Sequence, residues 1–266
     1  MTNKKKAIVF DNSGTLVERY RALKDLKTGL IIDDVSSLDI VDNGVKRALV
    51  VLQTDPAKCI INARPYQTIY EFITRNKIKI DVSYSTAEKR KNEIIDAIKE
   101  DKSQVKDIQD TIKAVMDKNY NVQICSGSGI IVAVDLHEIE FTISSGGKIF
   151  PEVPLVIKEL QKQGINMFIA SGDRKASLQT LAKYIGLPPE NVFDTADAWK
   201  KMEIVKKLKQ KYKVMMVGNS VNDIFALKEA DIGVLTEQQK ENNPERLYNA
   251  TDVVINNINE LLDVDF

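Results

Sequence analysis

The sequence predicts an α/β protein in which a parallel-sheet domain is interrupted by a second, smaller α/β domain. After Phe150, short apolar runs alternate with helical patterns, which is typical of a parallel sheet. A further apolar run, Lys6–Phe10, stands near the N-terminus and ends in Asp11. The stretch between carries antiparallel pairing signals. We therefore predict one domain from residues 1–17 and 148–266 and an inserted domain from residues 18–147.

Composition narrows the function classes. The 266 residues are 43% hydrophobic, enough for a sizeable core, and 38 basic residues balance 38 acidic ones. This balance favours neither a nucleic-acid nor a membrane-surface partner. No apolar run approaches the roughly 20 residues of a membrane span, and no signal peptide is recognisable. Two cysteines form no disulfide framework, so we expect a cytoplasmic protein. A lone His137 also argues against histidine-based catalysis.

Short strands, a turn and a helix are predicted in the first part of the insertion. Leu16–Ile32 has weak periodicity and is expected to be an exit segment into the insertion. The next expected elements, in order, are a strand at Leu38–Val41, an Asn43-Gly44 turn, a strand at Arg47–Leu52, a helix from Pro65 to about Thr74, and a strand at Ile78–Ser83.

Two helices, or one bent helix, are predicted after a capping box at Ser85–Glu88, with Glu100–Ser103 interrupting the apolar face. The rest of the insertion predicts strands at Val122–Ile124, Ile130–Val134 and Ile139–Ile143, with Ser126–Gly129 as a turn rather than a phosphate cradle, and Gly146-Gly147 as a flexible joint.

Beyond Phe150 the elements are better marked. Apolar residues from Val153 to Leu160 recur at helical spacing, and Gly186 follows another such helix as a C-cap. The expected strands are Met167–Ala170, Val192-Phe193, Val214–Val217, Ile232–Leu235 and Val253–Ile255, with helices around Leu178–Ile185, Lys200–Leu208 and Asn222–Ala230.

Polar, turn-rich corners follow three of the predicted parallel strands: Asp11–Thr15, Ser171–Asp173 and Gly218–Asp223. The carboxyl ends of parallel strands share one edge of a sheet, so these corners should converge. Carboxylates, a hydroxyl, an amide and a lysine suit phosphoryl transfer, which needs a nucleophile, a divalent cation and donors for the phosphoryl oxygens.

These corners resemble the ordered motifs of the haloacid dehalogenase superfamily. Asp11–Leu16 looks like its first motif, Ser171–Asp173 its second, Lys201 its third and Val217–Asp223 its fourth. The details are similar to those of P-type ATPases, above all the soluble archaeal P-type-ATPase-like phosphatases. The resemblance covers about residues 5–17 and 148–266. It implies a Rossmann-like core with residues 18–147 as an inserted cap domain.

The resemblance also implies roles for the site. Asp11 is the phosphate-accepting nucleophile and, with the Ser13 carbonyl, a ligand of Mg²⁺. Ser171 and the Gly172 amide hold phosphoryl oxygens, and Lys201 neutralises charge. Lys200 is the competing residue; the apolar spacing after Lys201 favours the latter.

Asn222 and Asp223 support the metal side, with Asp223 as a ligand and Asn222 also among the phosphate-binding residues. Two residues depart from the family pattern. Ser13 stands where most phosphatases of the superfamily carry an aspartate acting as general acid and base, and a hydroxyl is a poor base near neutral pH. Asn219 stands at a metal-ligating aspartate and brings no charge. Slow hydrolysis of the phosphoenzyme and weakened Mg²⁺ binding are expected.

The sequence thus predicts a Mg²⁺-dependent phosphatase that acts on a small phosphorylated substrate through an aspartyl-phosphate. One alternative is a soluble ATP hydrolase related to the pump headpiece. Nucleotide binding by residues 18–147 would favour it, although a Lys-Gly-Ala signature is missing there. Another alternative is a phosphate- or partner-binding pseudoenzyme, which Ser13 and Asn219 together suggest.

Overall fold

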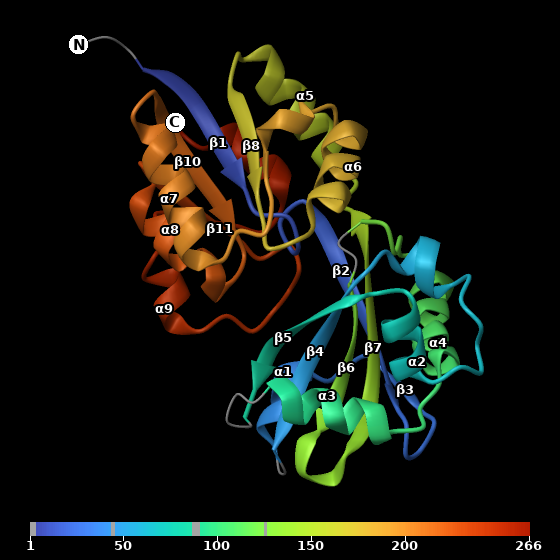
Figure 1. Cartoon of the computed structure of the whole chain (residues 1–266). Helices are drawn as coiled ribbons and strands as arrows, with labels where there is room; N and C mark the ends of the chain where they lie inside the picture. Colours follow the sequence, from blue (N-terminus) through green and yellow to red (C-terminus); the bar gives the residue numbers. More distant parts are fainter. Residues whose placement is uncertain (1–3, 44–45, 87–90, 125–126) are drawn as a thin grey trace. The chain divides into compact units, whose positions relative to one another are not determined.

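The computed structural model describes residues 4–43, 46–86, 91–124 and 127–266 (Figure 1). The chain divides into two compact units, which are described separately below. Met1–Arg19 and Lys148–Phe266 form the first unit, and Tyr20–Gly147 forms the second. Among the described residues, no helix is both long and apolar enough to cross a membrane.

A six-stranded sheet forms the centre of the first unit, and its neighbouring strands pair in parallel. Its spatial order is β12 (Val253–Ile255), β11 (Ile232–Thr236), β10 (Tyr212–Gly218), β1 (Lys5–Phe10), β8 (Asn166–Ala170) and β9 (Val192–Phe193). The buried end of β1, from Ala7 to Phe10, has at most 1% of its surface exposed. Such a run, apolar at every position, is typical of a strand covered on both faces. This sheet confirms the predicted α/β class.

The order of the strands places a topological switch at β1. After β1 the chain adds β8 and β9 on one side, then returns to add β10, β11 and β12 on the other. At such a switch point, the loops that follow the two neighbouring strands run to opposite sides of the sheet. Open α/β sheets bind ligands in the crevice that this creates at the carboxyl edge.

Helices flank this sheet. They are α5 (Val153–Lys162), α6 (Lys175–Ile185), α7 (Ala198–Lys209), α8 (Ile224–Glu229) and the short α9 (Glu245–Tyr248). Figure 1 shows α5 and α6 beside β8, and α7 and α8 beside β10 and β11. Gly186 ends α6 with φ +79°, as predicted from its position after the apolar face.

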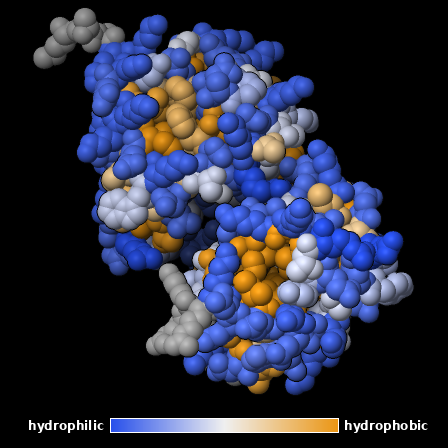
Figure 2. Space-filling model, viewed as in Figure 1, coloured by the Kyte–Doolittle hydropathy of each residue, from blue (hydrophilic) through white to orange (hydrophobic). Residues whose placement is uncertain are grey.

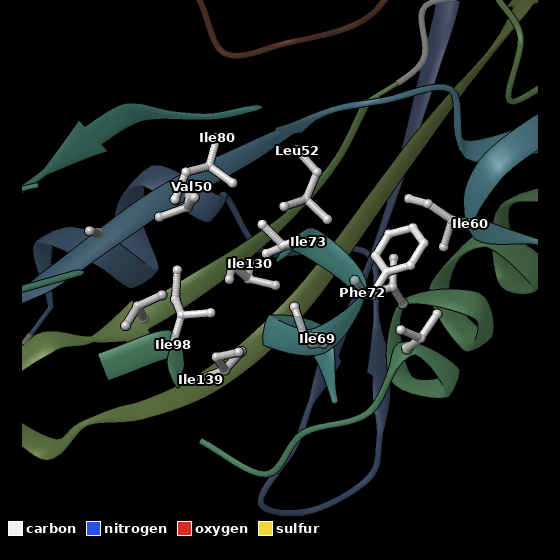
Figure 3. Packing of buried hydrophobic residues seen from close by; sticks show 14 of the residues in the cluster. Val50, Leu52, Ile60, Ile69, Phe72, Ile73, Ile80, Ile98, Ile130 and Ile139 are labelled. Carbon is white, nitrogen blue, oxygen red and sulfur yellow. The ribbon is translucent and has the colours of Figure 1, made fainter. Parts of the chain in front are cut away.

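The second unit contains a six-stranded sheet in which β2 pairs antiparallel with β3, β4 with β5 and β6, and β6 with β7. Its order is β3 (Ile31–Ile32), β2 (Val17–Asp25), β7 (Glu138–Ile149), β6 (Gly127–Ala133), β4 (Arg47–Gln53) and β5 (Lys79–Ser85). Its helices are α1 (Ser37–Asp42), α2 (Ile69–Arg75), α3 (Lys91–Glu100) and α4 (Val105–Asp117). Figure 3 shows side chains of α2 and α3 packed toward β4 and β6, including Phe72, Ile98 and Ile130.

Several predictions for this unit are wrong. Leu38–Val41 is helical, because Ser36 caps α1 by accepting from the Leu38 amide and only Val41 of these four residues is buried. The expected exit segment instead contains β2, whose side chains are mostly half-buried and give no clean alternation. Val122–Ile124 forms turns and no strand.

The glycines of the β6–β7 region also differ from the prediction. Gly146-Gly147 is no flexible joint: it lies within β7, and Gly147 exchanges two backbone hydrogen bonds with Asn121. A Cβ on Gly146 would meet Val115 Cγ1 at 2.5 Å, so close packing explains that glycine. Gly127 and Gly129 belong to β6. Three predictions lie partly outside the described residues: the Asn43-Gly44 turn, the Ser85–Glu88 capping box and the Ser126–Gly129 turn.

Candidate active site

The loop after β1 is tightly wound around the Asn12 carbonyl. Asp11 extends the ladder with β10 by donating its amide to the Val217 carbonyl at 2.9 Å. The Asn12 carbonyl then accepts from the amides of Thr15, Leu16 and Val17 at 3.2, 2.9 and 3.1 Å. These bonds fold the chain back immediately after Asp11, so its carboxylate stands at the carboxyl end of the central strand.

Gly14 is required in this loop for two reasons. Its φ is +89°, which glycine adopts without steric cost. A Cβ at this position would also lie only 2.1 Å from Nδ2 of Asn219. The first loop is therefore in close contact with the loop after β10, and the two motifs meet as predicted from the parallel sheet.

Lys201 joins two of these corners directly. Its Nζ donates to Oδ1 of Asp11 at 2.6 Å and to Oδ1 of Asp223 at 2.7 Å. The lysine is 4% exposed, and α7 carries it one turn inside a helix capped by Asp197. Lys200 is exposed and donates instead to the carbonyl of Asp194 at 2.7 Å. The geometry thus favours Lys201 over its neighbour.

Asp223 is fully buried, and both of its carboxylate oxygens have partners. Oδ1 accepts from Lys201, while Oδ2 accepts from the amides of Asn219 and Ser220 at 3.1 Å each. A Cβ on Gly218 would meet the Asp223 side chain at 2.6 Å. Asp223 therefore fixes the loop after β10 and orients Lys201. Its predicted role as a metal ligand stays a prediction, and these contacts favour a positioning role.

Burial and neighbouring charges act in opposite directions on the pKa values of Asp11 and Lys201. Desolvation raises the pKa of Asp11 to about 7, against the Lys201 ammonium, which lowers it; nearby Asp223 raises it further. Burial by itself would lower the pKa of Lys201, but the two carboxylates outweigh it and hold that pKa above its usual range. With both carboxylates ionised the trio carries one net negative charge, which suits a cation.

A second network links Ser171 to the first loop through Asp173. Asp173 Oδ2 accepts from Nδ2 of Asn12 at 2.7 Å and from the hydroxyl of Ser171 at 2.9 Å. Asp173 lies within the second motif, but the sequence predicted no role for its side chain. The sequence feature that could have indicated this contact is Asn12, a polar residue directly after Asp11 that is 1% exposed and therefore needs a hydrogen-bond partner. This network brings Ser171 to the site and fixes its rotamer.

The remaining predicted residues are placed less directly. Asn219 is 3% exposed, and its Oδ1 is 3.5 Å from the Thr15 hydroxyl, at the limit of a hydrogen bond. Ser13 follows Asn12 in the same loop and is half-buried. Gly172 is exposed, with its backbone open to a ligand. Asn222 is exposed, and among the described residues no hydrogen bond joins it to the other site residues.

The donor set fits Mg²⁺. The described residues contain no group of three or more His, Cys, Asp or Glu side chains that could hold a metal ion. Mg²⁺, however, prefers oxygen ligands, keeps several waters and needs only one or two carboxylates beside a substrate phosphate. Asp11 and the Asn219 amide oxygen meet that requirement, and the net negative charge of the Asp11–Lys201–Asp223 trio adds to it.

Comparisons with known proteins agree with this geometry. Residues 5–231 match the family of haloacid dehalogenase-like hydrolases. A soluble P-type ATPase-like phosphatase of Methanocaldococcus jannaschii is 35% identical over 261 residues, which cover 98% of this chain and 93% of that protein. A copper-exporting P-type ATPase B of Archaeoglobus fulgidus is 32% identical over 108 residues, covering 41% of this chain but 15% of that protein.

Among solved structures, the catalytic domain of the CPx-ATPase CopB-B aligns with a TM-score of 0.50 and 16% identity, covering 97% of this chain and 88% of that one. At this identity the likeness shows the fold alone.

Proposed function

This chain belongs to the haloacid dehalogenase-like hydrolases, and on that premise we propose that it is a Mg²⁺-dependent phosphatase working through an aspartyl-phosphate on Asp11. The observation that carries the proposal is the contact of Lys201 with Asp11 and Asp223 at the switch point of the sheet. A carboxylate, a buried cation and polar strand-end corners on one edge are the parts that phosphoryl transfer requires.

In the first step, an Asp11 oxygen attacks the phosphorus of the bound monoester. The new bond joins that oxygen to phosphorus, the bond to the ester oxygen breaks, and the leaving alkoxide takes a proton from water. Lys201 offsets charge on the nucleophile and the phosphoryl group, and the Gly172 amide donates to an equatorial oxygen. The Ser171 hydroxyl, which donates to Asp173 in the structure, would turn from Asp173 to donate to a second equatorial oxygen. Mg²⁺, when bound by Asp11, Asn219 and the Ser13 carbonyl, would draw electron density from the phosphoryl oxygens.

In the second step, water attacks the phosphorus, phosphate leaves and the Asp11 carboxylate is restored. The water must lose a proton, and Ser13 offers only a hydroxyl at the position after Asn12. General-base assistance typically contributes 10²–10⁴-fold. We therefore expect the phosphoenzyme to form faster than it decays.

The substrate is proposed to be a small phosphorylated molecule in the cytoplasm, selected by residues 20–147 acting as a cap. The similarity to a soluble phosphatase supports this assignment. The similarity to P-type ATPases, which for the Archaeoglobus fulgidus protein covers 41% of this chain, makes ATP one substrate to test beside aryl and sugar phosphates.

The test is a rapid-quench assay with ³²P-labelled monoester and Mg²⁺, followed by acid precipitation. We expect acid-stable label on the wild-type protein and none on Asp11→Asn. The matched control is Asp263→Asn, which changes an exposed carboxylate of the same unit and should label normally. Equal labelling of the Asp11→Asn variant, or hydrolysis of p-nitrophenyl phosphate that is unaffected by EDTA, would contradict the proposal.

A further inference from the structure

An apolar pocket opens in the second unit, in a part of the chain that the proposed chemistry does not use. The cavity is about 370 Å³, and its lining comes from α2, β5, α3 and the turn after α2. Figure 2 shows it as a hydrophobic hollow surrounded by hydrophilic residues. Five isoleucines provide most of the wall: Ile73, Ile78, Ile80, Ile95 and Ile98.

The polar part of the lining carries a single charge. Tyr70, Thr74 and Lys77 complete the wall, and no carboxylate belongs to it. The Thr74 hydroxyl is occupied, because it donates to the carbonyls of Tyr70 and Glu71 at 2.9 and 3.2 Å. Lys77 is exposed, and no ion pair joins it to another residue of the described ranges. An apolar wall with one unpaired ammonium suits a ligand that is apolar along its body and anionic at one end.

Lys77 also has an unusual backbone. It follows the C-cap of α2 with φ +51°, and the flanking bonds, from the Ile78 amide to Ile73 and from the Lys77 amide to Thr74, are 2.9 and 3.2 Å. Glycine is the residue that helix ends favour in this left-handed conformation. A lysine there costs stability that glycine would not, so packing does not account for its presence.

We propose that this pocket binds a small amphiphilic anion, with a hydrocarbon or aromatic body among the isoleucines and a terminal carboxylate or phosphate at Lys77. The cavity volume lies within the range of small-molecule sites, which are mostly apolar with a few polar groups that fix orientation. Lys77 lines the cavity and is exposed, and a lysine can cover apolar surface with its stem while its ammonium stays in solvent. This site is independent of the chemistry proposed for Asp11.

The first test is calorimetric titration of the full chain with decanoate, octanoate and 1-decanol at low ionic strength. We expect decanoate to bind at one site, and each methylene removed to weaken binding by about fourfold. The uncharged alcohol should bind about two- to fivefold more weakly than a carboxylate of equal length, as an exposed ion pair predicts. Absence of decanoate binding, or equal affinities for the acid and the alcohol, would overturn the proposal.

Two variants locate the site, each with a matched control. Ile95→Glu places a carboxylate in the wall and should weaken decanoate binding by more than tenfold, whereas Leu155→Glu, on an exposed helical face of the other unit, should not. If Ile95→Glu binds decanoate like the wild-type protein, the ligand occupies another place and the assignment fails.

Replacing Lys77 with glycine removes both the ammonium and the backbone strain at this position, and the two effects have separate readouts. It should raise the melting temperature by about 2–4 °C, because the left-handed conformation suits glycine, and remove the difference between acid and alcohol. Lys240→Gly is the control, since Lys240 also has positive φ (+55°) and does not line the pocket. It should raise stability without changing decanoate binding. Retention of the acid–alcohol difference in Lys77→Gly would show that Lys77 does not hold the anion.

Discussion

Replacing Lys201 with methionine should destabilise the protein strongly and in a pH-dependent way. The methionine side chain fills a similar volume but removes an ammonium that lies 2.6 Å from Asp11 and 2.7 Å from Asp223. Both carboxylates are almost fully buried, at 5% and 0% exposure. Removing one partner of a buried ion pair typically costs about 3–5 kcal/mol, since an uncompensated charge remains. With two carboxylates left facing each other, we expect at least that loss at pH 8.

The pH dependence follows from the direction of the pKa shifts. Burial already raises the pKa of Asp11 to about 7 with Lys201 in place, and removing the lysine must raise it further. Between the unfolded and folded pKa values, the folded state then holds more protons than the unfolded one. Stability therefore falls as pH rises through this window. Because Asp11 of the wild-type protein is itself mostly protonated at pH 5, the variant should lose about 1 kcal/mol less stability at pH 5 than at pH 8.

Urea unfolding at pH 5, 6.5 and 8 measures this effect. The control is Lys200→Met, which removes a neighbouring exposed lysine and should change the free energy of unfolding by less than about 1 kcal/mol at every pH. The reasoning is refuted if Lys201→Met loses the same free energy at pH 5 as at pH 8, or if the two variants behave alike. Phosphoenzyme formation should fall by at least about 100-fold in Lys201→Met only.

Three further outcomes are expected. Asn219→Asp adds a charged oxygen ligand, so Mg²⁺ titration of aryl-phosphate hydrolysis should show on the order of tenfold tighter Mg²⁺ dependence; unchanged dependence would mean that Asn219 is no ligand. Ser13→Asp supplies a base, so decay of labelled phosphoenzyme in single-turnover quench should accelerate by about 10²-fold. Gly14→Ala should cost clearly more unfolding free energy in urea than Gly29→Ala: both glycines have positive φ, but a Cβ meets Asn219 at 2.1 Å in the first case and no atom within 4 Å in the second.

The meeting of the polar corners at one edge of the sheet could be predicted from sequence because its signals are local. Each strand end reads as an apolar run followed by a polar turn, and parallel order places those ends together. The expected place of Lys201 beside Asp11 came from the family resemblance, and the structure shows its Nζ in contact with Asp11 and Asp223. The choice of Lys201 over Lys200 rested on the resemblance, because the apolar residues after Lys201 follow it at the offsets of the family.

The inserted unit was harder to predict because its local signals are weak or shared. β2 has mostly half-buried side chains, so no alternation marks it. Gly146 stands in a strand because Val115, far along the chain, approaches it. Nor could spacing show that Asp173 accepts from both Asn12 and Ser171, since this depends on side-chain directions across two loops. Such contacts form between residues that the fold brings together, and local sequence patterns do not show which residues these are.

Burial raises the pKa of Asp11 and the Lys201 ammonium lowers it, so the proposed nucleophile and this cation must be considered together. Burial alone favours the protonated carboxyl, which cannot attack phosphorus, and Lys201 opposes this by stabilising the anion. Asp223 in turn holds the lysine at the contact distance, with its second oxygen fixed by two backbone amides. A carboxylate kept ionised in a buried place is poorly solvated, and an incoming phosphoryl group meets it without a full hydration shell to displace. A phosphoryl group would then persist on Asp11 after transfer, because neither Lys201 nor the Ser13 hydroxyl can take a proton from the attacking water near neutral pH.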